Sequence, residues 1–300
     1  PAQTQQVQLD NQEAECRAAV AWAQQCQAEN PAARLAIVTP RLSEVRNLLA
    51  DLLDDVFYPL SARPGFAHTP RHYNFSLGVP LTQQPVIQAG LNLLRMFTVH
   101  QLQQSDVSAL LLSPFWSAGA QESDARARLD AGMREKLPMQ FTLSHLLAFI
   151  NEQQAEGLGL QALLTHMRAA TALHTAKKLP AAQWAQMLDN MLDALGWPGE
   201  RNISSLEYQA LNAWQKALQQ LAKMDVLGKN LALGEAVHYL QQICTNQVFQ
   251  AETELEPSIQ ILGIMEGLST PVDALWCMHM NDHIWPPPAR PNPLLPAFVQ

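Results

Sequence analysis

Arg34-Leu-Ala-Ile-Val-Thr39 is a short β-branched run that stops at Pro40. Such a run predicts a buried strand, because β-branched side chains suit a pleated surface and proline cannot continue a ladder. Strand character returns only near the end of the chain, in residues 258–264 and 273–280. A lone strand would leave its backbone groups unpaired. We therefore predict that all three segments form one sheet.

The sequence between these strand segments predicts helices. Ser43 is expected to cap a helix whose apolar residues are spaced as on one face, and residues 106–250 are helical throughout by the same periodicity. Pro180 opens one such helix, and Ser204 with Glu207 forms a capping box that opens another. The pattern predicts a discontinuous α/β domain, residues 1–105 and 252–300, interrupted by an all-α domain, residues 106–251.

Composition excludes several classes of protein. The chain has 300 residues, 48% of them apolar, and a net charge of -8. This length and apolar content are enough for a large core and exclude disorder. It has no apolar run of membrane-spanning length, and its first residues do not resemble a signal peptide. Its four cysteines form no CxxC pair. We therefore expect a cytoplasmic protein without membrane contact, cut from a longer chain.

Sequence motifs for catalysis are missing. Gly228-Lys229-Asn230 lacks the upstream glycine and the Ser or Thr of a phosphate-binding loop. No lysine has Asp or Glu two residues before it, as a metal-dependent PD-(D/E)xK nuclease requires. Cys277, His279 and His283 have no fourth ligand nearby. We predict no catalytic residue, no metal site and no cofactor within these residues.

The distribution of charge is more informative than the total. Residues 56–105 contain no Asp or Glu but carry arginine, histidine and aromatic residues. Guanidinium groups that contact phosphates and rings that stack on bases are typical of single-stranded nucleic acid binding, whereas a neutral loop packed on the helical insertion is the alternative. The candidate DNA contacts are Arg41, Arg63, Arg71, His72, Tyr73 and Trp285. For Trp285, the alternative role is to anchor the proline-rich turn in the core.

Residues of opposite charge are also regularly spaced in one helix of the insertion. Glu122 with Arg126, and Asp130 with Arg134, form i, i+4 pairs. Such pairs predict a solvated helix that supports itself. We assign no function to this helix.

Several segments resemble the bacterial probable DNA repair proteins related to AddB- and RecB-type helicase-nucleases. The resemblance covers residues 14–300 and is carried by Arg34-Leu-Ala-Ile-Val-Thr-Pro-Arg41, Asn74-Phe-Ser-Leu-Gly-Val-Pro-Leu81, Gly196-Trp-Pro-Gly-Glu-Arg201, Ile261-Leu-Gly-Ile-Met-Glu-Gly267 and Trp285-Pro-Pro-Pro-Ala-Arg-Pro-Asn-Pro-Leu-Leu-Pro296. It implies the second half of a superfamily 1 helicase: a RecA-like 2A domain interrupted by a helical 2B domain.

The resemblance also implies where this chain departs from active helicases. Pro40 stands where those enzymes carry a nucleotide-sensing arginine, and Arg41 follows one residue later. The segment at Gly263 lacks the His and Lys that couple ATP to DNA, and His279 stands where the family pattern favours glycine. The resemblance therefore implies a degenerate helicase, with ATP and a divalent metal confined to other parts of the parent protein.

Together these observations predict a non-catalytic, helicase-like module of a DNA repair exonuclease or helicase. It would position single-stranded DNA for a nuclease domain outside these residues, and its parent would be an ATP-dependent hydrolase with a helicase-nuclease partner subunit. The alternative is a protein-interaction scaffold of a repair complex that does not contact DNA. The net charge of -8 opposes strong binding to DNA, because phosphate neutralisation supplies most non-specific affinity.

Overall fold

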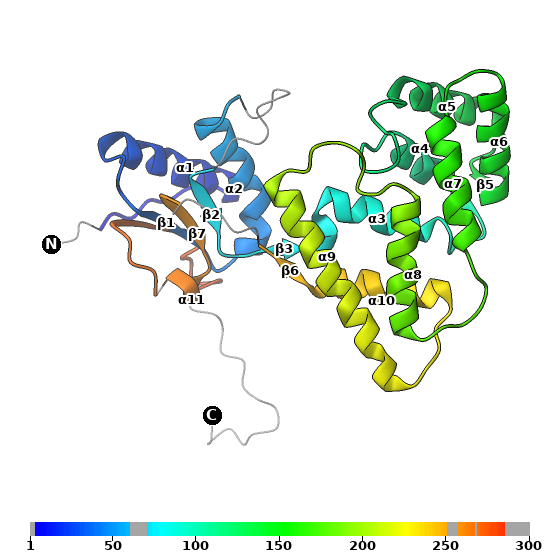
Figure 1. Cartoon of the computed structure of the whole chain (residues 1–300). Helices are drawn as coiled ribbons and strands as arrows, with labels where there is room; N and C mark the ends of the chain where they lie inside the picture. The colour runs from blue at the N-terminus through cyan, green and yellow to red at the C-terminus, as the bar shows by residue number, and fades with distance from the viewer. Residues whose placement is uncertain (1–3, 61–70, 251–256, 268, 286–300) are drawn as a thin grey trace. The chain divides into compact units, whose positions relative to one another are not determined.

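The structure of the chain is a computed structural model that describes residues 4–60, 71–250, 257–267 and 269–285 (Figure 1). The chain divides into two compact units, and each is described by itself. The first comprises residues 1–78 and 252–300, and the second comprises residues 79–251. Arg63 lies outside the described residues.

The first unit contains a four-stranded parallel sheet. Its strands, in spatial order, are β2 (Tyr73–Phe75), β7 (Ile259–Leu262), β1 (Leu35–Val38) and β8 (Ala274–Cys277). In the central register, Leu35 lies opposite Ile259 on one side and Ala274 on the other. The prediction that the early segment pairs with both late segments is confirmed. β2 is a fourth strand that the sequence analysis did not predict.

Two helices cover one face of this sheet, α1 (Gln12–Glu29) and α2 (Leu42–Phe57) (Figure 1). Side chains alternate between the faces with a period of two, so Leu35 and Ile37 join the core beneath these helices. Val38 points to the other face, where the short helix α11 (Ile264–Gly267) packs. A Cβ on Gly267 would lie 2.8 Å from Val38 Cγ2, so a larger residue there would force Val38 or the helix to shift.

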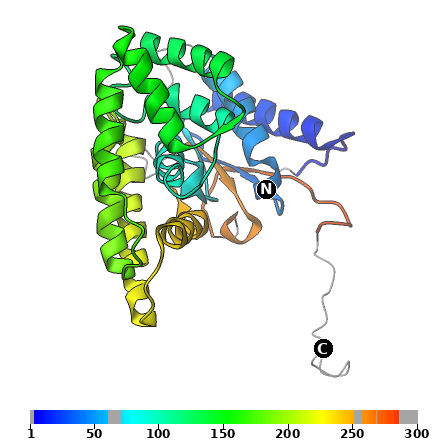
Figure 2. The same ribbon diagram turned by 90° about the vertical axis from the view of Figure 1, so that its right-hand side faces the viewer.

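The second unit is helical, with two small antiparallel ribbons, β3–β6 and β4–β5. Its long helices α8, α9 and α10 pack side by side in both views (Figures 1 and 2). Its elements are β3 (Val79–Pro80), η1 (Leu81–Gln83), α3 (Pro85–Arg95), β4 (Leu102–Gln103), α4 (Gln104–Leu111), α5 (Ser123–Lys136), β5 (Gln140–Phe141), α6 (Leu143–Ala155), α7 (Gln161–Leu173), α8 (Ala181–Ala194), α9 (Ser205–Lys223), η2 (Met224–Leu227), α10 (Leu233–Asn246) and β6 (Val248–Phe249).

The second unit begins earlier than the sequence analysis placed it. The predicted boundary after residue 105 falls inside this unit, whereas the boundary after residue 251 coincides with the observed one. The reason is the packing of α3, whose apolar face enters the helical core. Trp197 Nε1 also donates a hydrogen bond to the Val86 carbonyl oxygen at 2.9 Å. Residues 79–105 therefore fold with the helical insertion.

Helix signals read from the sequence are confirmed in the second unit. Ser204 is the N-cap of α9: its hydroxyl accepts the Glu207 N–H, and the Glu207 carboxylate accepts the Ser204 N–H. α8 follows Pro180 and buries its apolar stripe, including Trp184. No helix in the described part of the chain is long and apolar enough to cross a membrane.

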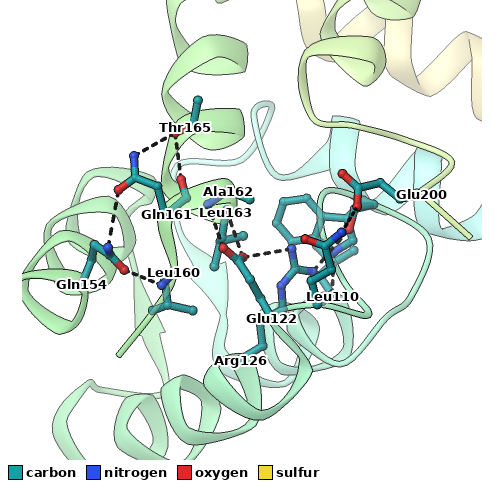
Figure 3. Close-up of polar contacts among 12 residues, drawn as sticks. Leu110, Glu122, Arg126, Gln154, Leu160, Gln161, Ala162, Leu163, Thr165 and Glu200 are labelled. Atoms are coloured by element: carbon teal, nitrogen blue, oxygen red, sulfur yellow. Dashed lines mark hydrogen bonds and ion pairs between the residues drawn. The ribbon is translucent and has the colours of Figure 1, made fainter. Parts of the chain in front are cut away.

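The prediction that the charged helix α5 is solvated is wrong for one of its faces. Arg126 is 1% exposed and Glu122 is 8% exposed. The Glu122 carboxylate accepts the backbone N–H groups of Ala162 and Leu163, at 2.7 and 3.0 Å (Figure 3). These groups belong to the first turn of α7, which has no side-chain cap of its own. The acid is buried because it caps a neighbouring helix.

Candidate nucleic-acid interface

The predicted DNA contacts lie at opposite ends of the parallel sheet. Because Tyr73 is level with Ile259 and Leu35, it marks the amino ends of the strands, and Arg71 and His72 precede it. Arg41 lies three residues beyond Val38, after the carboxyl end of β1. The structure therefore brings Arg71, His72 and Tyr73 together and places Arg41 at the other edge.

At the amino end, Arg71 and Tyr73 converge on a carboxylate. Arg71 Nε and Nη2 donate to the two carboxylate oxygens of Asp54, at 2.9 and 2.8 Å, and the Tyr73 hydroxyl donates to Asp54 Oδ1 at 2.7 Å. The Arg71 guanidinium also lies 5.0 Å from the centre of the Tyr58 ring. The Tyr58 hydroxyl accepts the His72 backbone N–H at 2.6 Å. This network is the amino-end cluster.

The pKa values in the amino-end cluster follow from these contacts. Burial tends to raise the pKa of Asp54, but the hydrogen bonds from Arg71 and Tyr73 outweigh it and hold that pKa below its ordinary value. Hydrogen bonding to Asp54 in turn raises the pKa of Arg71. Burial, followed by the Asp54 contact, raises the pKa of Tyr73. Asp54 is therefore ionised at neutral pH and neutralises the charge of Arg71.

At the carboxyl end, a hydroxyl, an imidazole and a carboxylate lie in line. Thr39 Oγ1 lies 2.8 Å from His279 Nδ1, and His279 Nε2 lies 3.5 Å from Glu15 Oε2. This order of groups occurs in nucleophilic catalysis, which requires a hydroxyl that substrate can reach. Thr39 is 0% exposed, and its hydroxyl also accepts the Arg41 backbone N–H at 3.1 Å. The three groups therefore join α1, β1 and β8, and the hydroxyl of Thr39 is buried.

Two arginines flank the start of α2 at the same carboxyl end. The prediction that Ser43 caps this helix is wrong, because Arg41 occupies the N-cap position and Ser43 lies within the first turn. The Arg41 side chain makes no capping hydrogen bond, is 44% exposed and lies 3.4 Å from Glu44. Arg46 lies one turn into the helix. Its Nε donates to the Leu77 carbonyl oxygen at 3.2 Å, and its guanidinium stacks 4.9 Å from the centre of the Phe75 ring. The uncapped helix start and the two cations favour an anion here, and the Glu44 carboxylate of the first turn competes with that anion for Arg41.

Sequence reasoning missed Arg46. Nothing in the local sequence marks it, because its partners Phe75 and Leu77 belong to β2 and the residues that follow. The available signal was its position on the helix that follows β1, near the edge where parallel sheets bind ligands.

The remaining predicted residues add little to either end. Trp285 is 39% exposed, and its backbone N–H donates to the Asn281 carbonyl oxygen at 2.8 Å. His283 is exposed and pairs with Asp282, whereas His279 is held by Thr39. Across the described ranges, no group of three His, Cys, Asp or Glu side chains is placed to hold a metal ion.

A comparison with protein-family models gives no match for this chain, and a comparison with curated proteins gives no significant match. The function of the chain is therefore inferred from its residues and their geometry.

Proposed function

We propose that this chain is a non-catalytic, helicase-like module that holds single-stranded DNA for a nuclease domain elsewhere in a longer protein. The observation that carries the proposal is the carboxyl edge of the parallel sheet, where Arg41 and Arg46 flank the uncapped start of α2. Helix starts at this edge of α/β sheets bind phosphate groups through backbone N–H groups and the helix dipole. The DNA backbone supplies such phosphates.

The arrangement of the first unit supports a RecA-like 2A domain interrupted by a 2B domain. β2 and β7 are neighbours in the sheet, yet the whole helical unit lies between them in sequence. His279, which stands where the family pattern favours glycine, has a φ of 59°. Glycine adopts that left-handed region freely. We assign ATP and a divalent metal to other parts of the longer protein.

The amino-end cluster is not part of the proposed surface. Arg71 is neutralised by Asp54, so a phosphate there would compete with a bidentate carboxylate. DNA contact is therefore expected from few cations, and with a net charge of -8 the binding should be weak, with a small salt slope set by the few phosphates contacted.

Fluorescence anisotropy of labelled single-stranded DNA tests the proposal, at low salt and near physiological salt. Arg41→Ala should weaken binding equally for all base sequences and reduce the salt slope by about 1. Arg17→Ala is the matched control, because Arg17 is an exposed arginine of the same unit that pairs with Glu13 on α1. We expect Arg17→Ala to bind as the unmodified chain does. Absence of binding at low salt, or equal losses in both variants, would contradict the proposal and favour the scaffold alternative.

A further inference from the structure

A groove of about 410 Å³ runs along α9 and α10 in the second unit. Its polar lining consists of Tyr239 and four primary amides, Gln220, Gln242, Asn246 and Gln247. We call it the amide groove. No Lys, Arg, Asp or Glu side chain lines it. A ligand held here is therefore recognised by neutral hydrogen bonds and ring contacts, and not by charge.

The groove has an apolar floor and unused hydrogen-bonding groups. Met224, Tyr239 and Ile243 pack against the main hydrophobic core of the second unit, which fixes the floor. No hydrogen bond joins the side chains of Gln220 or Asn246 to any other described residue. Gln220 and Asn246 are therefore available to a ligand, whereas Gln242 already contacts His238 Nε2 at 3.0 Å and Gln247 donates to the Ala213 carbonyl oxygen at 3.3 Å.

We propose that the amide groove binds a nucleobase. A primary amide offers a donor and an acceptor side by side, which matches the edge of a base, as asparagine and glutamine do with adenine. An aromatic ring such as that of Tyr239 offers a surface on which a base can stack. The volume lies at the small end of the range for ligand pockets, roughly 300–1,000 Å³, so it suits one ring system better than a run of peptide residues.

The source of the base rests on the proposed function. If the chain holds single-stranded DNA, an unpaired base of that strand is the ligand, and the phosphate contacts at Arg41 are a separate surface on the other unit. A free nucleoside carries the same chemistry. The two sources differ in whether the bound base is part of a DNA strand or of a free nucleoside.

Saturation-transfer NMR with the four deoxynucleosides tests the site without phosphate. The variant Gln220→Ala/Gln242→Ala removes one amide from each helix of the groove, and both residues are exposed, so the fold should be retained. We expect it to weaken the preferred deoxynucleoside about tenfold. The matched control, Gln219→Ala/Gln241→Ala, removes exposed amides of the same helices that do not line the groove, and it should bind as the unmodified chain does.

A second arm compares a single-stranded oligonucleotide with an abasic strand of the same length. Tighter binding of the base-bearing strand, lost in the groove variant, identifies the strand as the source. Equal binding of the two strands together with deoxynucleoside binding identifies a free nucleoside.

Two results would overturn the inference. One is that no deoxynucleoside binds; salt-dependent DNA binding through Arg41 would still support the proposed function. The other is that a short neutral peptide occupies the groove in place of the deoxynucleosides. Conversely, deoxynucleoside binding without any DNA binding would retain the groove site and reject the proposed function.

Discussion

Thr39 Oγ1 lies 2.8 Å from Nδ1 of His279, and both residues are buried. The contact joins the ends of two neighbouring strands, because Thr39 follows β1 and His279 follows β8. The His279 backbone N–H also donates to Glu15 Oε1 at 2.7 Å. The contact between Thr39 and His279 positions the loop that carries Arg41 in the proposed DNA surface.

His279 should be replaced by glycine at a lower cost than by alanine. Both changes remove the Thr39 contact, but alanine keeps a side chain at a φ of 59°, where L-residues are strained by about 1 kcal/mol. We expect His279→Ala to be less stable than His279→Gly by about that amount in urea unfolding. Equal stabilities would show that the left-handed backbone is not strained.

Glu122→Ala should strongly destabilise the second unit. It leaves the first turn of α7 without its cap and Arg126 buried without an acidic partner. Breaking a buried pair in this way costs about 3 kcal/mol or more, measurable by urea unfolding.

Two variants test that explanation. Asp124→Asn changes an exposed acid on the same helix and should alter stability by less than about 0.5 kcal/mol. The double variant Glu122→Ala/Arg126→Met removes the cap and both charges and should be more stable than Glu122→Ala, because it leaves no unpaired buried charge. If it is not, the lost cap and not the buried charge accounts for the destabilisation.

The amino-end cluster should make the first unit sensitive to acid. The pKa of Asp54 in the folded chain lies below its unfolded value of about 3.9, so its stabilising contribution is complete above that pH. It is lost as the pH falls through the folded pKa. Asp54→Asn should therefore destabilise the unit at pH 7, and this effect should shrink below the unfolded pKa and vanish as the pH falls through the folded pKa of Asp54. Asp51→Asn, at an exposed position of the same helix, should show no such pH dependence in parallel urea titrations.

Gly90→Ala should destabilise the second unit despite the better helix propensity of alanine. The added Cβ would lie 3.0 Å from Trp197 Cε2, and Trp197 is held by its hydrogen bond to Val86. Overpacking of this kind costs roughly 1–3 kcal/mol. In contrast, Gly234→Ala meets only Thr98 Cβ at 3.9 Å and should be neutral or stabilising by up to about 1 kcal/mol. A stable Gly90→Ala variant would mean that Trp197 moves aside.

The sequence predicted the elements whose pattern is long enough to recognise. β1, β7 and β8 are each four residues long and contain β-branched or large apolar side chains, and the α9 start carries a full capping box. β2 was missed because three residues between glycine- and proline-rich segments show no measurable period. The two-residue strands of the small ribbons are shorter still.

The candidate site was harder to predict, because its contacts cross long stretches of sequence. Arg71 and Tyr73 stood out within residues 56–105, which contain no acid, yet the acid that binds them is Asp54, just outside that window. The charge pattern identified the cations and aromatic rings. It gave no information on their partner, because only the fold brings α2 alongside β2.

The sheet order has a consequence for how the chain folds as it leaves the ribosome. β1 lies between β7 and β8, so it has no strand partner until residues 259–277 have been synthesised. The helical unit is continuous from residue 79 to residue 251 and can form before that. During this interval α1 and α2 lack the sheet that covers their apolar faces, so the nascent chain exposes them to chaperones until its last strands emerge.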